Sequence, residues 1–368
     1  MRLIAIAIFT ITFILVFPVV GQAEPQVSAR NAVLIEQSTG RVLFEKQAYS
    51  KESIASITKI MTAIIAIESG KMEEKAKTSR NAIYTEGSSI YLEQGEKMTI
   101  KDLVYGLMLR SGNDSAVAIS EHIGGSEEGF VYLMNEKARW LGMNDTNFAN
   151  PHGLDEENHY SSAYDMAILT QYAMKNPTFR EVTGAKSYKA ENRTYSWQNK
   201  NKLLTQYYEY STGGKTGFTK KTGRTLVSTA TKNDMDLIAV TLNAPDDWRD
   251  HIAMFEWGFK NYRLETLSEE KKIAYQLGNE EKIQFGYLDK DVIYPLTNQE
   301  KNKVSNQLFI LNNATNKQTI GRNVFYLNGT QIAEATVLSK QPKHTATNSM
   351  VKEFWEIFRR VSGGDDLW

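Results

Sequence analysis

Ser56 and Lys59, three residues apart, are the strongest candidates for chemistry in this chain of 368 residues. A spacing of three places both side chains on one face of a helix, one turn apart and within hydrogen-bond reach. Residues 54–67 are apolar on nearly every side, which predicts a buried helix. Burial disfavours the charged ammonium, so it lowers the pKa of a lysine and lets the neutral amine act as a general base. The pattern therefore predicts a nucleophilic Ser56 activated by Lys59.

The Ser-x-x-Lys spacing by itself is a weak signal, because it occurs three times in this chain. The other copies begin at Ser268 and Ser349, in polar or terminal segments without an apolar helix around them. A serine and a lysine on a solvated helix face are the plain structural interpretation of any single copy. The apolar surroundings favour Ser56, which would also lie at the start of its helix, where backbone N–H groups stabilise a developing oxyanion.

A second polar motif, Ser111-Gly112-Asn113, lies in an expected break between two helices. Short polar side chains at such a break can project into a cleft. Ser79-Arg80-Asn81 has the same spacing, but it follows the first helix closely in a polar stretch. The position between two helices favours the copy at Ser111.

A third motif, Lys215-Thr216-Gly217, stands at the start of the last strand-like runs. Lys221-Thr222-Gly223 repeats it six residues later, where a basic turn leading into the next strand is the plain interpretation. Gly213-Gly214 precedes the first copy and would let a substrate lie flush against the strand. We therefore prefer Lys215.

Helices and strands must together position these motifs. Residues 32–35 and 41–44 flank a Ser-Thr-Gly turn and predict a β-hairpin. Helical patterns then follow at 56–69, 99–109, 114–123 and 126–141, strand-like runs at 225–231 and 237–242, and a helix at 247–260. Because helices separate a leading strand pair from trailing strands, we expect an α/β (α+β) fold. Its antiparallel sheet would take its edges from opposite ends of the chain and would carry a helical insert.

The pattern changes after residue 262. Short β-rich runs predominate there, and Asn328-Gly329 between two extended runs is a strong hairpin signal. We expect residues 24–262 to form the catalytic domain and residues 265–345 to form a separate small all-β domain.

Both ends of the chain point to export and the membrane surface. Residues 1–23 combine Arg2, a long apolar run and small residues before an expected cleavage after Ala23. They predict a signal peptide, with an uncleaved anchor as the alternative. Residues 346–368 carry apolar side chains at helical spacing beside basic flanks, which predicts an amphipathic helix lying in the membrane interface. Docking of this helix on the protein's own surface is the alternative.

Composition and missing motifs exclude several classes of protein. Lysine plus arginine and aspartate plus glutamate each number 43, so the balance of charge removes the basic excess expected of a nucleic-acid binder. Without cysteine the chain has no disulfides, Fe–S clusters or cysteine nucleophile. The five histidines are too scattered to propose a metal site. Dinucleotide and P-loop motifs and the Gly-x-Ser-x-Gly elbow are also missing from the sequence.

The ordered motifs resemble those of the serine penicillin-binding proteins and β-lactamases. The resemblance is closer to the low-molecular-weight D-alanyl-D-alanine carboxypeptidases, peptidase family S11, and within them to the sporulation-specific DacB type. The segments that carry it are residues 55–63 (ASITKIMTA), 109–114 (LRSGND), 150–154 (NPHGL), 210–217 (YSTGGKTG), 213–218 (GGKTGF) and the Gly363-Gly364 tail. It implies a β-lactamase/transpeptidase-like catalytic domain, peptidoglycan stem peptides ending in D-Ala-D-Ala as substrates, and β-lactams as inhibitors.

The resemblance also implies a role for each site residue. Ser56 would attack the carbonyl of the penultimate D-alanine, Lys59 would take the serine proton, and Ser111 would relay protons toward the leaving amine. Asn113 would bind the substrate peptide, while Lys215 and Thr216 would bind its carboxylate. The backbone N–H groups of Ser56 and Phe218 would form the oxyanion hole. Neither a metal nor an organic cofactor would be needed.

Three residues and two alternative functions stay open. His152 could be catalytic or a loop histidine satisfied by backbone groups, Lys200 could contact substrate or remain solvated, and Arg249 is a candidate for the terminal carboxylate. A weakly catalytic protein that binds penicillin or peptidoglycan is one alternative to a carboxypeptidase. A serine β-lactamase is the other, although no acidic deacylation motif can be assigned.

Overall fold

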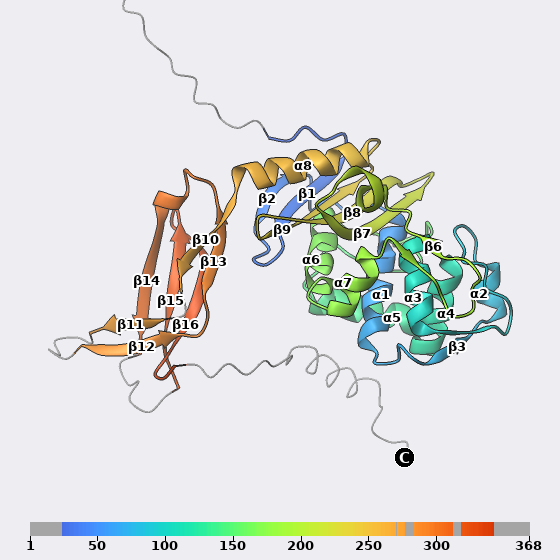
Figure 1. The fold of residues 1–368 in the computed structure, drawn as a ribbon, viewed down its shortest axis with the longest axis horizontal. Helices are drawn as coiled ribbons and strands as arrows, with labels where there is room; N and C mark the ends of the chain where they lie inside the picture. Colours follow the sequence, from blue (N-terminus) through green and yellow to red (C-terminus); the bar gives the residue numbers. More distant parts are fainter. Residues whose placement is uncertain (1–23, 270, 277–282, 312–317, 342–368) are drawn as a thin grey trace, which may run out of the picture.

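The computed structural model describes residues 24–269, 271–276, 283–311 and 318–341 (Figure 1). The predicted signal peptide at 1–23 and the predicted tail helix at 346–368 lie outside these residues. In the described part of the chain, no helix is both long enough and apolar enough to cross a bilayer.

A five-stranded antiparallel sheet in the order β2-β1-β9-β8-β7 forms the frame of the larger unit (Figure 1). Its strands are β1 (Asn31–Glu36), β2 (Val42–Lys46), β7 (Ser211–Thr219), β8 (Gly223–Lys232) and β9 (Met235–Leu242). The edge strand β2 comes from the start of the chain, and the edge strand β7 follows the helices. The predicted sheet with edges from opposite ends of the chain is therefore confirmed.

Strand β1 shows how one sheet serves two cores. All six of its residues are buried, because both faces of the sheet are covered. Val33 and Ile35 pack with the helical region, whereas Ala32 and Leu34 pack beneath α8 (Asp247–Asn261). Successive side chains of a strand point to opposite faces, so this alternation follows from the backbone. Figure 1 shows α8 along one face of the sheet and the helical region on the other.

The helical insert lies between β2 and β7 in the chain. Its helices are α1 (Lys59–Glu68), α2 (Arg80–Tyr84), α3 (Ile100–Tyr105), α4 (Asn113–Gly124), α5 (Glu127–Trp140), α6 (Ala163–Ala173) and α7 (Pro177–Gly184). Two short strand pairs accompany them: β3 (Lys75–Lys77) with β4 (Lys97–Thr99), and β5 (Ser187–Tyr188) with β6 (Trp197–Gln198). The single turn η3 (Leu203–Tyr207) leads into β7.

Two of the predicted helices have a different local form. The helix predicted at 56–69 opens with a 3₁₀ turn, η1 (Ala55–Thr58), and becomes α-helical at Lys59. The helix predicted at 99–109 is α3 followed by a π-helical turn, η2 (Gly106–Arg110). This wider turn ends at Ser111, whose φ of 63° is left-handed, so the chain changes direction there before α4 begins. Apolar periodicity alone does not separate these tighter and wider turns from an α-helix.

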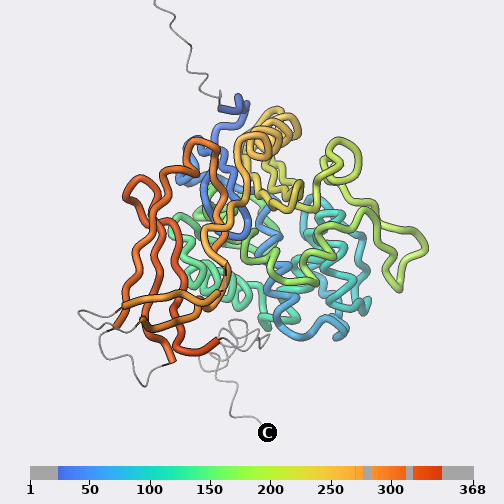
Figure 2. Tube along the Cα trace, turned by 60° about the vertical axis from the view of Figure 1, so that its left-hand side comes forward, coloured from blue at the N-terminus to red at the C-terminus, as the bar shows by residue number. Residues whose placement is uncertain are grey.

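The chain after α8 forms a second, β-rich unit, which Figure 2 follows from residue 263 onward. Strands β10 (Arg263–Ser268) and β13 (Val292–Leu296) pair with each other. The other strands form a sheet in the order β11-β12-β16-β15-β14, from β11 (Lys272–Tyr275), β12 (Gln284–Leu288), β14 (Val304–Ile310), β15 (Thr319–Leu327) and β16 (Thr330–Leu338), with a 3₁₀ turn at η4 (Lys301–Lys303). Asn328 and Gly329 turn between β15 and β16 with φ of 51° and 83°, so the predicted hairpin is confirmed.

Arg41, at the start of the first hairpin's second strand, connects the two units. Its guanidinium lies 2.5 Å from the Glu300 carboxylate and also donates to the Pro295 carbonyl. The rings of Tyr262 and Tyr294 lie 5.2 and 5.1 Å from its central carbon. Charge and cation–π contacts thus hold the β-rich unit against the first hairpin.

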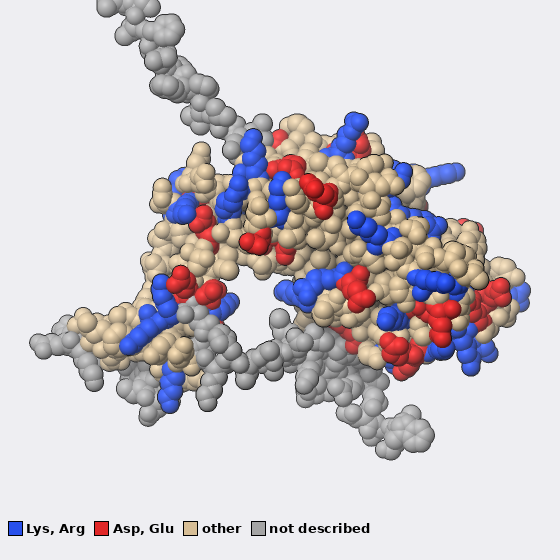
Figure 3. All heavy atoms as spheres, viewed as in Figure 1, with Lys and Arg blue, Asp and Glu red and all other residues tan. Residues whose placement is uncertain are grey.

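Surface charge follows the neutral composition. On the face drawn in Figure 3, lysine and arginine are interspersed with aspartate and glutamate rather than separated into a patch of one sign. This distribution gives that face no broad electrostatic preference for a polyanion.

Candidate active site

Ser56 and Lys59 meet where η1 passes into α1. Lys59 is fully buried, and its Nζ donates to Ser56 Oγ at 3.0 Å, to Asn113 Oδ1 at 2.7 Å and to the His152 carbonyl at 2.5 Å. The predicted proximity of the serine and the lysine is therefore present. The surrounding cluster includes Ile57, Ile60 and Met61, so the lysine amine lies at the edge of the main hydrophobic core.

The surroundings of Lys59 favour its neutral form. Burial is the largest cause that lowers its pKa well below the usual range of lysine, and the nearby charges of Lys215 and Lys200 lower it further. Asp114 acts in the opposite direction and more weakly. A neutral amine can accept the proton of the Ser56 hydroxyl, which is the chemistry that a general base needs.

Ser111 and Lys215 form a second hydrogen-bonded pair. Lys215 Nζ donates to Ser111 Oγ at 3.1 Å and to the Thr216 carbonyl at 2.7 Å. Burial, and then the charge of Lys200, lower the pKa of Lys215 to about 7. Near neutral pH this amine therefore both holds and releases a proton readily. Ser111 itself is buried, and its left-handed backbone conformation at the end of η2 sets its position.

Asn113 bridges the first pair to a neighbouring loop. Its Oδ1 accepts from Lys59, and its Nδ2 donates to the Glu86 carbonyl. At Gly87, which has a φ of 91°, an added Cβ would lie 2.8 Å from Asn113 Nδ2. Glycine is required there because the conformation is left-handed and the space is already filled.

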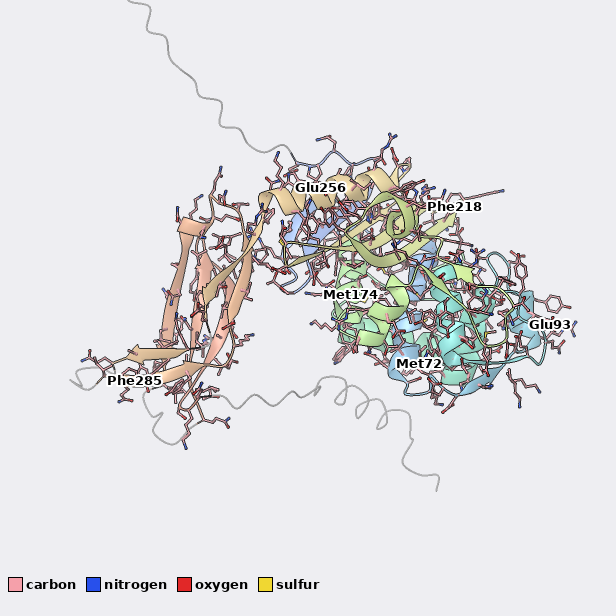
Figure 4. The ribbon with its side chains drawn as sticks, in the orientation of Figure 1. Met72, Glu93, Met174, Phe218, Glu256 and Phe285 are labelled. Carbon is pink, nitrogen blue, oxygen red and sulfur yellow. The ribbon has the colours of Figure 1, made fainter. Side chains whose placement is uncertain are left out.

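Strand β7 brings the third motif beside Ser56. A Cβ added at Gly217 would lie 2.9 Å from the backbone nitrogen of Ser56, so only glycine lets the strand come this close. β7 is an edge strand, which leaves one row of its backbone groups outside the sheet and able to pair with an extended peptide. Thr216 is half-buried, and the ring of Phe218, labelled in Figure 4, is 65% exposed near the strand's end.

The second copies of the three motifs lie apart from this cluster of hydrogen-bonded side chains. Lys221 is exposed in the turn between β7 and β8, and Thr222 donates to the Asp155 carboxylate at 3.0 Å. Ser79 caps α2 by accepting from the Ala82 N–H. Ser268 ends β10 in the β-rich unit, and Ser349 lies outside the described residues.

The three residues whose roles the sequence left open have different surroundings in the structure. The His152 carbonyl accepts from Lys59, while its ring Nδ1 accepts from the Leu154 N–H at 3.2 Å; burial and the charge of Lys59 lower its pKa to about 3. These contacts agree with a loop histidine satisfied by backbone groups. Lys200 is exposed and donates to Ser88 Oγ at 3.1 Å, and its charge lowers the pKa of Lys59. Arg249 is 84% exposed on α8 and pairs with Asp246 at 3.4 Å.

Sequence reasoning missed Asp114, which holds residues 89–92 next to the site. Asp114 is buried, and its carboxylate accepts from Ser89 Oγ at 2.6 Å and from the backbone N–H groups of Ile90 and Leu92 at 3.1 Å. It thereby fixes residues 89–92 against the start of α4. An acidic residue in a first helical turn beside Asn113 was the only local signal for it.

The described residues contain no group of three or more histidine, aspartate or glutamate side chains arranged to hold a metal ion. The site residues supply a hydroxyl, two amines with lowered pKa values and backbone donors.

Known proteins resemble this chain over most of its length. The family profile described as D-alanyl-D-alanine carboxypeptidase matches residues 19–246. The carboxypeptidase DacF of Bacillus subtilis is 36% identical over 332 residues, covering 85% of each chain, and DacA of Escherichia coli is 30% identical over 345 residues, covering 86% of this chain and 84% of its own.

Solved structures of related proteins have the same fold. Penicillin-binding protein 5 of Haemophilus influenzae superposes with a TM-score of 0.74 at 28% identity, over 86% of this chain and 98% of its own. The carboxypeptidase DacD of Francisella tularensis gives a TM-score of 0.69 at 25% identity, over 86% and 94%. The β-lactamase/transpeptidase-like fold expected from the motifs is thus confirmed. The chain belongs to the D-alanyl-D-alanine carboxypeptidases of peptidase family S11 and is a serine-type enzyme of that family.

Proposed function

We propose that Ser56 is the nucleophile with which this carboxypeptidase removes the terminal D-alanine of peptidoglycan stem peptides. The observation that carries the proposal is the fully buried Lys59 amine, 3.0 Å from Ser56 Oγ and with a lowered pKa. Ser56 Oγ bonds to the carbonyl carbon of the penultimate D-alanine while its proton passes to Lys59 Nζ. The C–N bond then breaks, the terminal D-alanine leaves, and water hydrolyses the resulting ester.

Ser111 and Lys215 serve the leaving group. The Ser111 hydroxyl gives a proton to the departing amine and recovers one through its 3.1 Å hydrogen bond with Lys215. A pKa of about 7 suits Lys215 for this exchange at neutral pH. In its charged form Lys215 attracts the substrate carboxylate, which Thr216 also binds through its hydroxyl.

Backbone donors stabilise the tetrahedral intermediate. The N–H groups of Ser56 and Phe218 form the oxyanion hole, supported by the close approach of Gly217 to the Ser56 nitrogen. Each such donor contributes about 3–4 kcal/mol to transition-state stability in comparable sites. Asn113 keeps one amide proton for the substrate peptide after donating the other to Glu86.

β-Lactams acylate Ser56 in this scheme, because their strained amide meets the same nucleophile and the same oxyanion donors. The two alternative functions differ in how long the acyl group remains. A penicillin-binding protein without turnover keeps the adduct and cleaves no peptide, whereas a β-lactamase releases it rapidly. The carboxypeptidases among the relatives favour turnover of the peptide.

Mass spectrometry of the intact protein and of its proteolytic peptides tests the nucleophile. Incubation with penicillin should add one acyl group to the peptide that contains Ser56, and a D-Ala-D-Ala peptide should lose its terminal residue. Ser56→Ala should abolish both reactions, while Ser268→Ala, in the second Ser-x-x-Lys copy, should preserve both. An adduct on Ser268 or Ser349 would overturn the assignment.

The site of action is proposed from the sequence. Residues 1–23 direct export, residues 24–262 form the catalytic domain, residues 265–345 form the small β-domain, and residues 346–368 attach the enzyme to the outer face of the cytoplasmic membrane. Spore-cortex peptidoglycan is the proposed setting, supported by the resemblance of residues 210–217 and of Gly363-Gly364 to the sporulation-specific type.

A further inference from the structure

A small cavity opens beside the proposed active site. Its volume is about 180 Å³, and its lining comprises Ser89, Ile90, Tyr91, Arg110, Tyr195, Ser196, Trp197 and Gln198. Two of these residues are close in sequence to residues of the proposed site. Arg110 immediately precedes Ser111, and Gln198 lies two residues before Lys200, which reaches across to Ser88.

The walls of this cavity are held from opposite sides. Asp114 fixes Ser89 and Ile90 through hydrogen bonds of 2.6 and 3.1 Å. On the other wall, Arg110 Nη1 donates to the Gln198 carbonyl at 3.2 Å, tying the end of η2 to β6. The cavity is therefore built from three segments that hydrogen bonds hold in place.

Positive charge at the cavity is not neutralised by the protein. Among the described residues, neither Arg110 nor Lys200 has an aspartate or glutamate oxygen within 4.0 Å. The charge of Arg110 is, after burial, the second cause that lowers the pKa of Lys200. Arg110 carries five N–H donors and uses one of them in the bond to Gln198. Two cations without an acidic partner, one of them in the cavity lining, attract an anion.

The remaining lining fits a peptide group that carries such an anion. Tyr91 is 78% exposed and Tyr195 is 54% exposed, so both can cover the aliphatic part of a side chain. Trp197 is buried, and its ring contributes apolar surface to the cavity lining.

We infer that this cavity binds a second carboxylate of the substrate, outside the D-Ala-D-Ala unit, through the Arg110 guanidinium. The inference rests on the proposed function, because it places the cavity beside the reacting serine. Arginine suits this task since its planar fork pairs with both oxygens of a carboxylate. The carboxylate belongs either to the side chain of the residue before D-Ala-D-Ala or to the leaving amino acid.

Three peptides distinguish these two sources. The first is diacetyl-Lys-D-Ala-D-Ala, which has only its terminal carboxylate. The second replaces the lysine with a residue that bears a side-chain carboxylate, and the third ends in D-Ala-D-Glu. The quantity to compare is kcat/KM for each acidic peptide divided by kcat/KM for the first peptide, in wild type and in Arg110→Gln.

Arg110→Gln should lower this ratio roughly tenfold for one acidic peptide, the one whose carboxylate enters the cavity, because a charge-assisted hydrogen bond is lost. Arg110→Lys should restore part of the ratio, since it keeps the charge and loses the fork. Arg139→Gln, an exposed arginine on α5 that pairs with Glu136, is the matched control and should keep the wild-type ratio. Equal ratios in wild type and Arg110→Gln for both acidic peptides would overturn the inference.

Binding without turnover separates this inference from the proposed mechanism. Calorimetry on Ser56→Ala and on Ser56→Ala with Arg110→Gln measures the affinity of the same peptides. A wild-type protein that neither cleaves peptides nor reacts with penicillin would contradict the proposed role of Ser56. Affinities for the acidic peptides that do not change with Arg110→Gln would contradict the carboxylate site.

Discussion

Lys215 Nζ donates a hydrogen bond to Ser111 Oγ across 3.1 Å, although the two residues are 104 positions apart in the chain. The bond joins the edge strand β7 to the left-handed turn between η2 and α4. Lys215 is also the second largest cause of the lowered pKa of Lys59. The charge of Lys215 thus helps to keep Lys59 neutral, so a change at Lys215 should alter the pKa of Lys59.

Replacing Lys59 by arginine should slow acylation by labelled penicillin by about 10²–10⁴-fold. The guanidinium stays protonated, so it cannot take the Ser56 proton. Lys59→Met is a second variant that removes the base with a side chain of similar length, and thermal unfolding shows whether each variant folds. Acylation at nearly the wild-type rate in a folded variant would mean that another base operates.

Alanine at Lys215 should raise KM for a D-Ala-D-Ala peptide by roughly tenfold or more, because a buried cation beside the substrate carboxylate is lost. Lys221→Ala is the matched control. That side chain is exposed in the β7–β8 turn, and its loss should leave KM close to the wild-type value. The reverse result would show that the second Lys-Thr-Gly copy binds the substrate.

The pH profile of kcat/KM should be bell-shaped. Lys59 must be neutral to act as a base, so activity falls as the pH drops through its lowered pKa and the amine becomes charged. Lys215, with a pKa of about 7, loses its proton as the pH rises above that value, and its attraction for the substrate carboxylate is lost with it. Measurement of kcat/KM over a range of pH values should show the fall in activity on the alkaline side near pH 7. A profile that keeps rising well above pH 7 would contradict the role of Lys215.

Asp114→Asn should loosen residues 89–92 and lower the free energy of unfolding by about 1–3 kcal/mol. The carboxylate accepts from a hydroxyl and two backbone N–H groups, and an amide cannot accept all of them with both of its polar atoms. Hydrogen exchange should increase at residues 89–92, and penicillin acylation should slow. Asp234→Asn is the control, since Asp234 is exposed in a left-handed turn that asparagine tolerates. Equal protection of residues 89–92 in both variants would remove this role from Asp114.

Deletion of residues 346–368 should give an active enzyme that no longer sediments with anionic vesicles. The deleted segment carries several bulky apolar residues, each worth roughly 1.5–3 kcal/mol when fully buried, and basic residues worth about 1 kcal/mol each near anionic lipid. Full-length protein should release from the vesicles as salt is raised, because the basic part of the attraction is screened. Continued co-sedimentation of the truncated protein, or loss of its fold, would contradict the predicted anchor.

Local interactions made much of this protein's structure predictable from its sequence. The spacing of Ser56 and Lys59 places them one helical turn apart whatever surrounds them, and the apolar run around them requires burial. The Asn328-Gly329 turn has a backbone conformation that few other residue pairs adopt. The same holds for the β-hairpin and for the sheet with helices inserted between its strands. Each of these follows from interactions within a few residues or from hydrophobic periodicity.

Tertiary packing alone decided how distant motifs meet. Ser56, Ser111 and Lys215 lie on three separate elements, and no local rule places the first Lys-Thr-Gly copy beside Ser111 and the second in an exposed turn. The left-handed conformation of Ser111 arises where a π-helical turn ends against α4, and apolar periodicity does not reveal it. The pKa of Lys215 depends on its burial and on the charge of Lys200. Burial and the charges that face a group are properties of the whole fold, because residues far apart in the chain create them.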